Sequence, residues 1–257
     1  RRWLGADEFI NGYQRWCLWL GDCPPNELRQ MPEAMKRVEA VRQFRLASKS
    51  PPTQKLADTP TRFHVENMPA STYLLIPEVS SERRDWIPIG FMHPDTLSSN
   101  LVKIVPHATL YHFGVLTSTM HMAWVRSVCG RLKSDYRYSA GIVYNNFPWP
   151  DAPADKTRQA IEAAAQAVLD VRAQFPDATL ADLYDPLSMP PALLKAHQKL
   201  DAAVDKAYGK SGFKSDAERV AFLFARYQTL TSLLPQTAPK KRASKAKTLQ
   251  EEGTIAP

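Results

Sequence analysis

The stretch Phe147-Pro148-Trp149-Pro150-Asp151-Ala152-Pro153 separates two parts of the chain whose sequence patterns differ. Proline lacks a backbone N–H and restricts the residue before it, so a helix or a central strand is not expected to run through this stretch. Short β-type runs, turns and a few helical patterns precede it, whereas a strongly helical sequence follows it. We therefore expect an α+β fold, with a mixed α/β domain at residues 1–150 and an all-α helical domain at residues 151–234.

Three amphipathic helices are predicted after the proline-rich stretch, at Asp155–Phe175, Pro190–Tyr208 and Ser215–Leu230. In the third helix, Ser215 is expected as the N-cap and Glu218 occupies the capping-box position. Since none of these helices can bury its apolar stripe alone, we expect them to pack on each other and on the first domain.

The first 150 residues are expected to combine short strands with two longer helices. Helical spacing predicts one helix over Pro32–Ser48 and another over Thr119–Val128, which Gly130 would end as a C-cap. Apolar runs bounded by Pro, Asp or Asn predict strands at Leu18–Leu20, Tyr73–Ile76, Trp86–Phe91 and Val102–Val105.

The 257 residues carry a formal net charge of +7, which is unevenly distributed along the chain. The net charge is +5 in residues 1–150, −1 in residues 151–234 and +3 in residues 235–257, a basic tail that we expect to be disordered. A basic surface favours polyanions such as nucleic acids, although charge alone does not decide the partner.

Several classes of protein are disfavoured by the sequence. No apolar run approaches the ~20 residues needed to cross a membrane, so no membrane association is expected. Cys17, Cys23 and Cys129 include no CxxC pair, which argues against disulfides and zinc and favours a reducing cytoplasm. The sequence contains no GxGxxG, P-loop, HExxH or GxSxG motif. We therefore assign no catalytic, cofactor-binding or metal-binding residue.

One stretch, Tyr144-Asn145-Asn146-Phe147-Pro148-Trp149-Pro150, partly matches a catalytic pattern. Methyltransferases that act on the adenine amine hold the flipped base with an Asn/Asp-Pro-Pro-aromatic loop. Phe147 stands where the first proline of that loop belongs, so the loop geometry is not reproduced. We interpret the stretch as a structural hinge in which Phe147 and Trp149 pack between the two domains.

Charged and apolar residues alternate between Arg131 and Ser139. On a strand, Lys133, Asp135 and Arg137 would share one face, with Leu132, Tyr136 and Tyr138 on the other. Lys and Arg donate to O6 and N7 of guanine, and Asp accepts from N4 of cytosine, so this face suits base edges in the major groove. The alternative is a surface ladder of alternating charges that stabilises the strand.

Further basic residues are candidates for contacts with DNA phosphates. One group forms a helical stripe and a second lies in the charged run Ser80–Asp85, and a sixth residue begins the alternating stretch. The alternatives are a solvated helix face for the first group and intramolecular ion pairs for the second. The six candidates are Arg42, Arg45, Lys49, Arg83, Arg84 and Arg131.

Several runs, in this order, resemble MmeI-like DNA methyltransferases. Those of the first domain resemble the target-recognition domain of these proteins, and those of the helical domain resemble their C-terminal domain. The runs are Phe9–Gly12, Arg15–Leu20, Ser80–Arg84, Tyr136–Ser139 and Asn145–Pro150, followed by Leu183–Pro186 and Met189–Pro191.

The resemblance implies a function in DNA modification. MmeI-like proteins are large single chains of type IIG restriction-modification systems that methylate adenine N6 with S-adenosylmethionine, often with a fused nuclease. This chain lacks the cofactor motif and the Asn-Pro-Pro-aromatic loop, so we expect a fragment, or a protein that needs a separate catalytic partner. No cofactor is expected in this chain, and S-adenosylmethionine is expected in the parent enzyme.

The resemblance also implies that Lys133 and Asp135 read one base pair, a G·C pair with guanine on the methylated strand, and makes Arg137 the next base-contact candidate. The expected function is therefore sequence-specific recognition of double-stranded DNA, which positions an upstream methyltransferase catalytic domain. The alternative is a docking module of the same enzyme that binds DNA only non-specifically.

Overall fold

The computed structural model describes residues 1–66, 68–210 and 212–232 and has the expected α+β fold, with small sheets in the first part and long helices in the second. The basic tail expected at residues 235–257 lies outside the described residues. Within the described residues, no helix combines the length and the apolar character that crossing a membrane requires.

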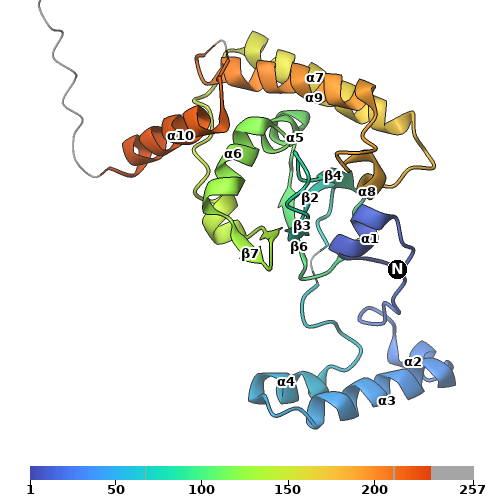
Figure 1. Cartoon of the computed structure of the whole chain (residues 1–257). Coiled ribbons are helices and arrows are strands. Elements are labelled where there is room, and N and C mark those ends of the chain that lie inside the picture. Colours follow the sequence, from blue (N-terminus) through green and yellow to red (C-terminus); the bar gives the residue numbers. More distant parts are fainter. Residues whose placement is uncertain (67, 211, 233–257) are drawn as a thin grey trace, which may run out of the picture.

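The chain begins with a strand and a short helix, β1 (Arg2–Leu4) and α1 (Ala6–Asn11), and then enters a helical arm. In Figure 1 this arm lies apart from the sheets and the long helices. Its elements are α2 (Pro25–Leu28), α3 (Pro32–Leu46), α4 (Pro51–Lys55) and the 3-10 helix η1 (Leu56–Asp58).

The arm buries little apolar surface. On α3, which ends two residues earlier than expected, Val38 is buried. Met35 and Val41, one helical turn to either side of it, are exposed, and Phe44 is 78% exposed. The arm is instead held by Arg45, whose guanidinium donates to the carbonyl oxygens of Leu56, Thr59 and Arg62 at 2.7, 2.9 and 2.7 Å.

Short strands form three small sheets. Two strands, β2 (Tyr73–Pro77) and β6 (Val102–Pro106), lie within one residue of their predicted ranges. They pair antiparallel with each other, and β4 (Gly90–Met92) pairs antiparallel with the other edge of β2. A parallel pair joins β1 to β5 (Thr96–Ser98). The third sheet has the order β3 (Val79–Ser80), β8 (Asp135–Arg137) and β7 (Gly130–Leu132).

Three local expectations for the first domain are wrong. Leu18–Leu20 is not a strand, because Trp19 stacks on Phe63 and its Nε1–H donates to Asp22 instead of the run joining a sheet. Of Trp86–Phe91 only the last two residues lie in a strand, while the buried residues before them are irregular. Gly130 begins β7, and the residue before it is the C-cap of the preceding helix.

The long helices match the expected ranges closely. Figure 1 shows α7 and α9 lying side by side over α5, and α10 beside α6. Ser215 caps α10 as expected, accepting from the backbone N–H of Glu218. The helices are α5 (Leu110–Leu116), α6 (Thr119–Val128), α7 (Asp155–Ala173), α8 (Leu180–Leu183), α9 (Pro191–Ala207) and α10 (Asp216–Thr231), with a π-helix, η2, at Ala140–Tyr144.

One hydrophobic core contains residues from both expected domains. Phe113 and Trp124 from the first part are buried together with Ile161 and Leu200 from the second. Phe147 of the proline-rich stretch is buried in the same core, with its ring 5.5 Å from that of Trp149 and 4.6 Å from that of His121. The stretch is therefore packed where the two parts meet, as its interpretation as a structural hinge requires.

Candidate nucleic-acid interface

The alternating stretch forms a hairpin and not the single strand that we expected. Leu132 on β7 pairs with Asp135 on β8, which leaves Lys133 and Ser134 as a two-residue loop. Lys133 has a φ of 56°, the positive value that such tight hairpin loops need. Lys133 therefore lies at the exposed tip of the hairpin, while Asp135 and Arg137 share one face of β8 as expected.

Aromatic residues anchor the hairpin to the core. Tyr136 and Tyr138 are buried, and the hydroxyl of Tyr138 lies 3.1 Å from Nε2 of the buried His121. The guanidinium of Arg131 covers the ring of Tyr136 at 4.2 Å and donates to the carbonyl of Ser134 at 2.9 Å. Arg131 therefore braces the loop that carries Lys133.

The Asp135 carboxylate is half-buried and held by the segment that follows β3. Its Oδ1 accepts a hydrogen bond of 3.2 Å from the backbone N–H of Glu82. Asp135 also lines a surface pocket of about 390 Å³ together with Asp7, Ser80 and Arg84. Asp135, the candidate for base reading, therefore lies in a surface pocket and has one carboxylate oxygen hydrogen-bonded within the chain.

Arg137 is paired with a buried glutamate. Its Nε lies 3.1 Å from Oε1 of Glu78, whose Oε2 receives the Lys103 ammonium at 2.8 Å. Burial alone would raise the pKa of Glu78, but the hydrogen bonds and charges of Lys103 and Arg137 outweigh that effect and lower the pKa. The Arg137 side chain remains 57% exposed, so more than half of it stays accessible.

The charged run after β3 makes the intramolecular ion pairs that we considered as an alternative. Arg83 lies 3.8 Å from the Asp185 carboxylate, and Arg131 lies 4.0 Å from that of Glu82. Arg84 is half-buried, donates to Ser80 Oγ at 3.4 Å, and has a buried Nε–H without a hydrogen-bond partner among the described residues.

Among the described residues, the three basic candidates on the arm, Arg42, Arg45 and Lys49, make no hydrogen bond or ion pair with the hairpin or with the run Ser80–Asp85. Arg42 is half-exposed and lies 3.8 Å from Glu39, and Lys49 is exposed. Arg45 differs, because its guanidinium is occupied by the three carbonyls that close the arm. These contacts give Arg45 a structural role in the arm, while its contact with a DNA phosphate stays a prediction.

Four residues of the site are not visible as candidates in the sequence: Glu78, Asp185, Arg126 and Asp216. Arg126 on α6 lies 2.6 Å from Asp216 at the start of α10 and donates to the backbone carbonyl of Asp85 at 3.1 Å. Each of these contacts joins residues at least 41 positions apart, so no local spacing reveals them. Among the described residues, no group of three or more His, Cys, Asp or Glu side chains could hold a metal ion.

Known proteins resemble this chain over nearly its whole length. Over 231 residues, 90% of the chain, it is 41% identical to DNA methyltransferase A of Bacillus subtilis (strain 168), of which it covers 26%. A solved structure of the type IIL restriction-modification enzyme MmeI in complex with DNA matches 91% of the chain, with 52% identity and a TM-score of 0.88. The match covers 31% of that MmeI chain, so this chain matches only about a quarter to a third of the length of each relative.

Two family models divide the chain close to Pro150. The model of the MmeI target recognition domain matches residues 1–151. The model of the MmeI C-terminal domain matches residues 153–235. The chain belongs to the MmeI family, of which it comprises a target recognition domain and a C-terminal domain.

Proposed function

We propose that this chain is the DNA-reading part of an adenine-N6 methyltransferase, and that the β7–β8 hairpin reads base pairs in the major groove. The observation that carries the proposal is the hairpin itself, with Lys133 exposed at its tip and Asp135 beside it. The major groove admits a two-stranded β-ribbon. The structural relative is an MmeI enzyme in complex with DNA, which supports the same assignment.

The proposed readers match the edges of one G·C pair. The Lys133 ammonium donates to O6 or N7 of guanine, and the Asp135 carboxylate accepts from N4 of cytosine. Asp135 has Oδ1 bound to the Glu82 N–H, which leaves Oδ2 for the cytosine amine. Arg137, two residues further along β8 and therefore about 6.6 Å away, is placed to contact a neighbouring base pair.

Basic side chains around the hairpin are proposed to bind phosphates. Arg131 is exposed on β7 of the hairpin and Arg83 is exposed beside it, while Arg84 there is half-buried. Arg42 and Lys49 are exposed on the arm. Each phosphate contact releases about 0.9 counterions, so binding should weaken steeply as salt rises.

The parent enzyme is proposed to supply the chemistry. Methyl transfer from S-adenosylmethionine to adenine N6 would take place in a catalytic domain outside this chain. The chain matches about a quarter of the length of its curated relative. The proposed partners are double-stranded DNA and that catalytic domain. We place the protein in the cytoplasm, where its three cysteines would stay reduced.

The test is selection of bound DNA from a randomised duplex pool at ~150 mM salt, followed by sequencing. The chain should enrich a motif with a G·C pair, and Lys133→Asn or Asp135→Asn should relax the preference at that pair alone, by about 1–3 kcal/mol. Asn suits position 133 because it tolerates a positive φ, so the loop is preserved. An equal loss on all sequences would instead make these residues phosphate or structural contacts.

A second function, docking on the rest of the parent enzyme, is favoured by the arm. Its exposed apolar residues on α3 are Met35, Val41, Phe44 and Leu46. Phe44 is the most exposed of them, at 78%, and large exposed apolar side chains on one element are a feature of interaction surfaces. Phe44→Ser should weaken binding to a separately produced catalytic domain, while Lys133→Asn should leave that binding unchanged. Tight docking without any enriched DNA motif would favour docking as the main role of the isolated chain.

A further inference from the structure

A five-residue segment, Ser81–Asp85, lies between the reading hairpin and the helical domain. At one side, the backbone N–H of Glu82 donates to the carboxylate of Asp135. At the other side, Arg83 contacts Asp185 of the helical domain, and Asp85 contacts Arg126, which is itself bound by the helical domain. The position of the segment, and with it the Asp135 carboxylate, therefore depends on both domains.

The first tie to the helical domain is Asp185, which follows α8. Its Oδ1 accepts a 2.9 Å hydrogen bond from the backbone N–H of Leu187, which fixes the orientation of the carboxylate. Its Oδ2 lies 3.8 Å from the Arg83 guanidinium. Arg84 is attracted by the carboxylates of both Asp185 and Asp135, and this attraction opposes the lowering of its pKa by burial.

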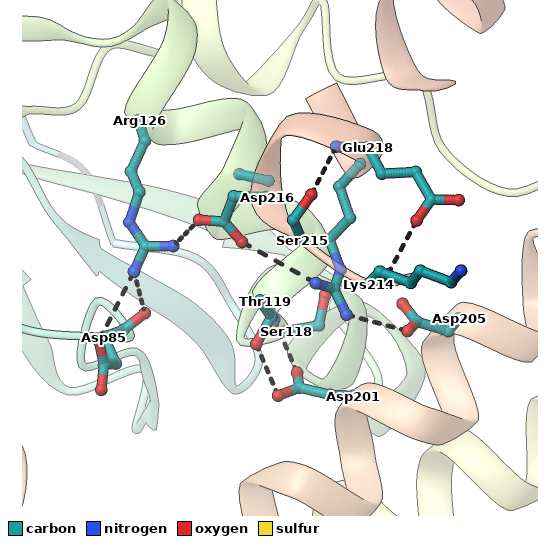
Figure 2. Close-up of polar contacts among 12 residues, drawn as sticks. Asp85, Ser118, Thr119, Arg126, Asp201, Asp205, Lys214, Ser215, Asp216 and Glu218 are labelled. Atoms are coloured by element: carbon teal, nitrogen blue, oxygen red, sulfur yellow. Dashed lines mark hydrogen bonds and ion pairs between the residues drawn. The ribbon is translucent and has the colours of Figure 1, made fainter. Parts of the chain in front are cut away.

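The second tie runs through Arg126 and is visible in Figure 2, where dashed lines connect this side chain to Asp85 and Asp216. Arg126 binds the Asp85 carbonyl at 3.1 Å with one nitrogen and the Asp216 carboxylate at 2.6 Å with the other. Asp216 is the first residue of α10. The segment that orients Asp135 is therefore held at its middle residue, Arg83, by Asp185, and at its last residue, Asp85, by Arg126, which pairs with Asp216.

We propose that the helical domain sets how strictly Asp135 discriminates its base pair, with Asp185 and Asp216 as positioning residues that act through Ser81–Asp85. The proposal rests on the proposed function, since Asp135 must read a base for its position to matter. Loss of either tie frees the segment and its Glu82 N–H. The Asp135 carboxylate then samples more orientations, and a poorly oriented acceptor distinguishes cytosine from other bases less well.

The test compares Asp185→Asn with Asp177→Asn in the full chain. The first substitution keeps a side-chain oxygen that can accept from the Leu187 N–H but removes the charge facing Arg83. Asp177 is an exposed carboxylate of the same domain without an ion pair among the described residues, so its substitution makes the same change in net charge. Dissociation constants are measured for three duplexes: the selected motif, the motif with A·T at the Asp135 pair, and one without the motif.

Asp185→Asn should reduce the ratio of affinities for the G·C and A·T duplexes by about three- to tenfold, a part of the total discrimination expected at one pair. Asp177→Asn should leave the ratio unchanged. In an Asp135→Asn background, Asp185→Asn should have no further effect on the ratio, whereas a general structural defect would still weaken binding. Asp216→Asn, checked for folding by its unfolding midpoint, should act in the same direction.

The outcomes separate this proposal from the one on which it rests. If the unchanged chain prefers G·C and Asp185→Asn behaves like Asp177→Asn, the positioning role is refuted while the reading role stands. The same holds if Asp185→Asn weakens binding equally on all three duplexes. If the unchanged chain shows no preference at any pair, the reading role fails and the positioning role fails with it.

Discussion

The Asp201 carboxylate on α9 caps the N-terminus of α6 by accepting hydrogen bonds from the backbone N–H and the hydroxyl of Thr119, at 2.7 and 2.6 Å (Figure 2). The two residues are 82 positions apart and belong to different domains. A helix N-terminus attracts negative charge, but here the carboxylate is partly buried. Its burial raises the pKa of Asp201 to about 6, and nearby Asp205 adds to the increase while Arg219 opposes it.

This cap makes stability depend on pH. Because the folded-state pKa of about 6 exceeds the ordinary value of 3.8, the folded chain binds this proton more tightly, and stability present at pH 4 is lost as the pH rises through 6. Asp201→Asn mimics the protonated form and should be more stable than the original chain at pH 7, by up to about 3 kcal/mol, with only a small part of that difference left at pH 4. Denaturant unfolding of both chains at pH 4, 5.5 and 7 measures this. A constant difference across the three pH values would show that Asp201 does not titrate as argued.

Gly114 on α5 is a point of close approach between the two domains. A Cβ there would lie 2.7 Å from Cγ2 of Ile161 on α7 and 3.2 Å from Cδ1 of Leu200 on α9. Gly114→Ala should therefore destabilise the chain by about 1–3 kcal/mol, although alanine favours helix by about 1 kcal/mol. The control is Gly141→Ala in η2, where the new Cβ meets nothing within 4 Å. Equal unfolding midpoints for the two variants would mean that the helices separate at little cost.

The parts of the fold with strong periodicity were predictable. The ranges of α6, α7, α9 and α10 follow from apolar spacing, prolines and the Ser215 cap, and two strands follow from their β-branched and apolar runs. The order of the strands was not predictable, because pairings such as that of Ser80 with Tyr136 join distant residues. That Lys133, Asp135 and Arg137 lie close together could be predicted, since they fall within five consecutive residues.

The hairpin shows where reasoning from alternation fails. A period of two residues is the same for one long strand and for two short strands joined by a two-residue loop, and only turn residues distinguish them. Lys133-Ser134 lacks the Gly, Asn or Asp that usually marks such a loop. Similarly, helical spacing predicted α3 itself, but it does not show that Met35 and Val41 lie exposed on an arm.

Arg45 and Arg42 allow a structural arginine to be distinguished from a phosphate contact. Arg45→Gln removes hydrogen bonds to the carbonyls of Leu56, Thr59 and Arg62, so the arm should loosen, and the amides of residues 56–62 should exchange faster with solvent. Arg42→Gln should leave exchange unchanged. If Arg42 binds a phosphate, this substitution reduces the dependence of log K on log salt by about 0.9. A reduced salt slope for Arg45→Gln without faster exchange would make Arg45 a phosphate contact and not a structural residue.

Glu78, which precedes β3, is predicted to be the group through which acid weakens the sheet of β3, β8 and β7. Its pKa is lowered in the folded chain, so it contributes stability above its ordinary value of 4.5, and that contribution is lost as the pH falls through the lowered pKa. Glu78→Gln should cost about 1 kcal/mol at pH 7, because Arg137 and Lys103 are partly exposed and water partly replaces their partner.

The same substitution should change base preference, since Arg137 loses the contact that orients its guanidinium. The enriched motif should relax at a pair next to the one read by Asp135 and stay unchanged at the Asp135 pair itself. Glu27→Gln, an exposed glutamate on the arm, is the matched control and should alter neither stability nor motif. Unfolding at pH 7 and pH 4, followed by DNA selection with the folded variants, tests both effects. If Glu78→Gln kept the original motif at every pair, Arg137 would be a structural partner of Glu78 and not a base contact.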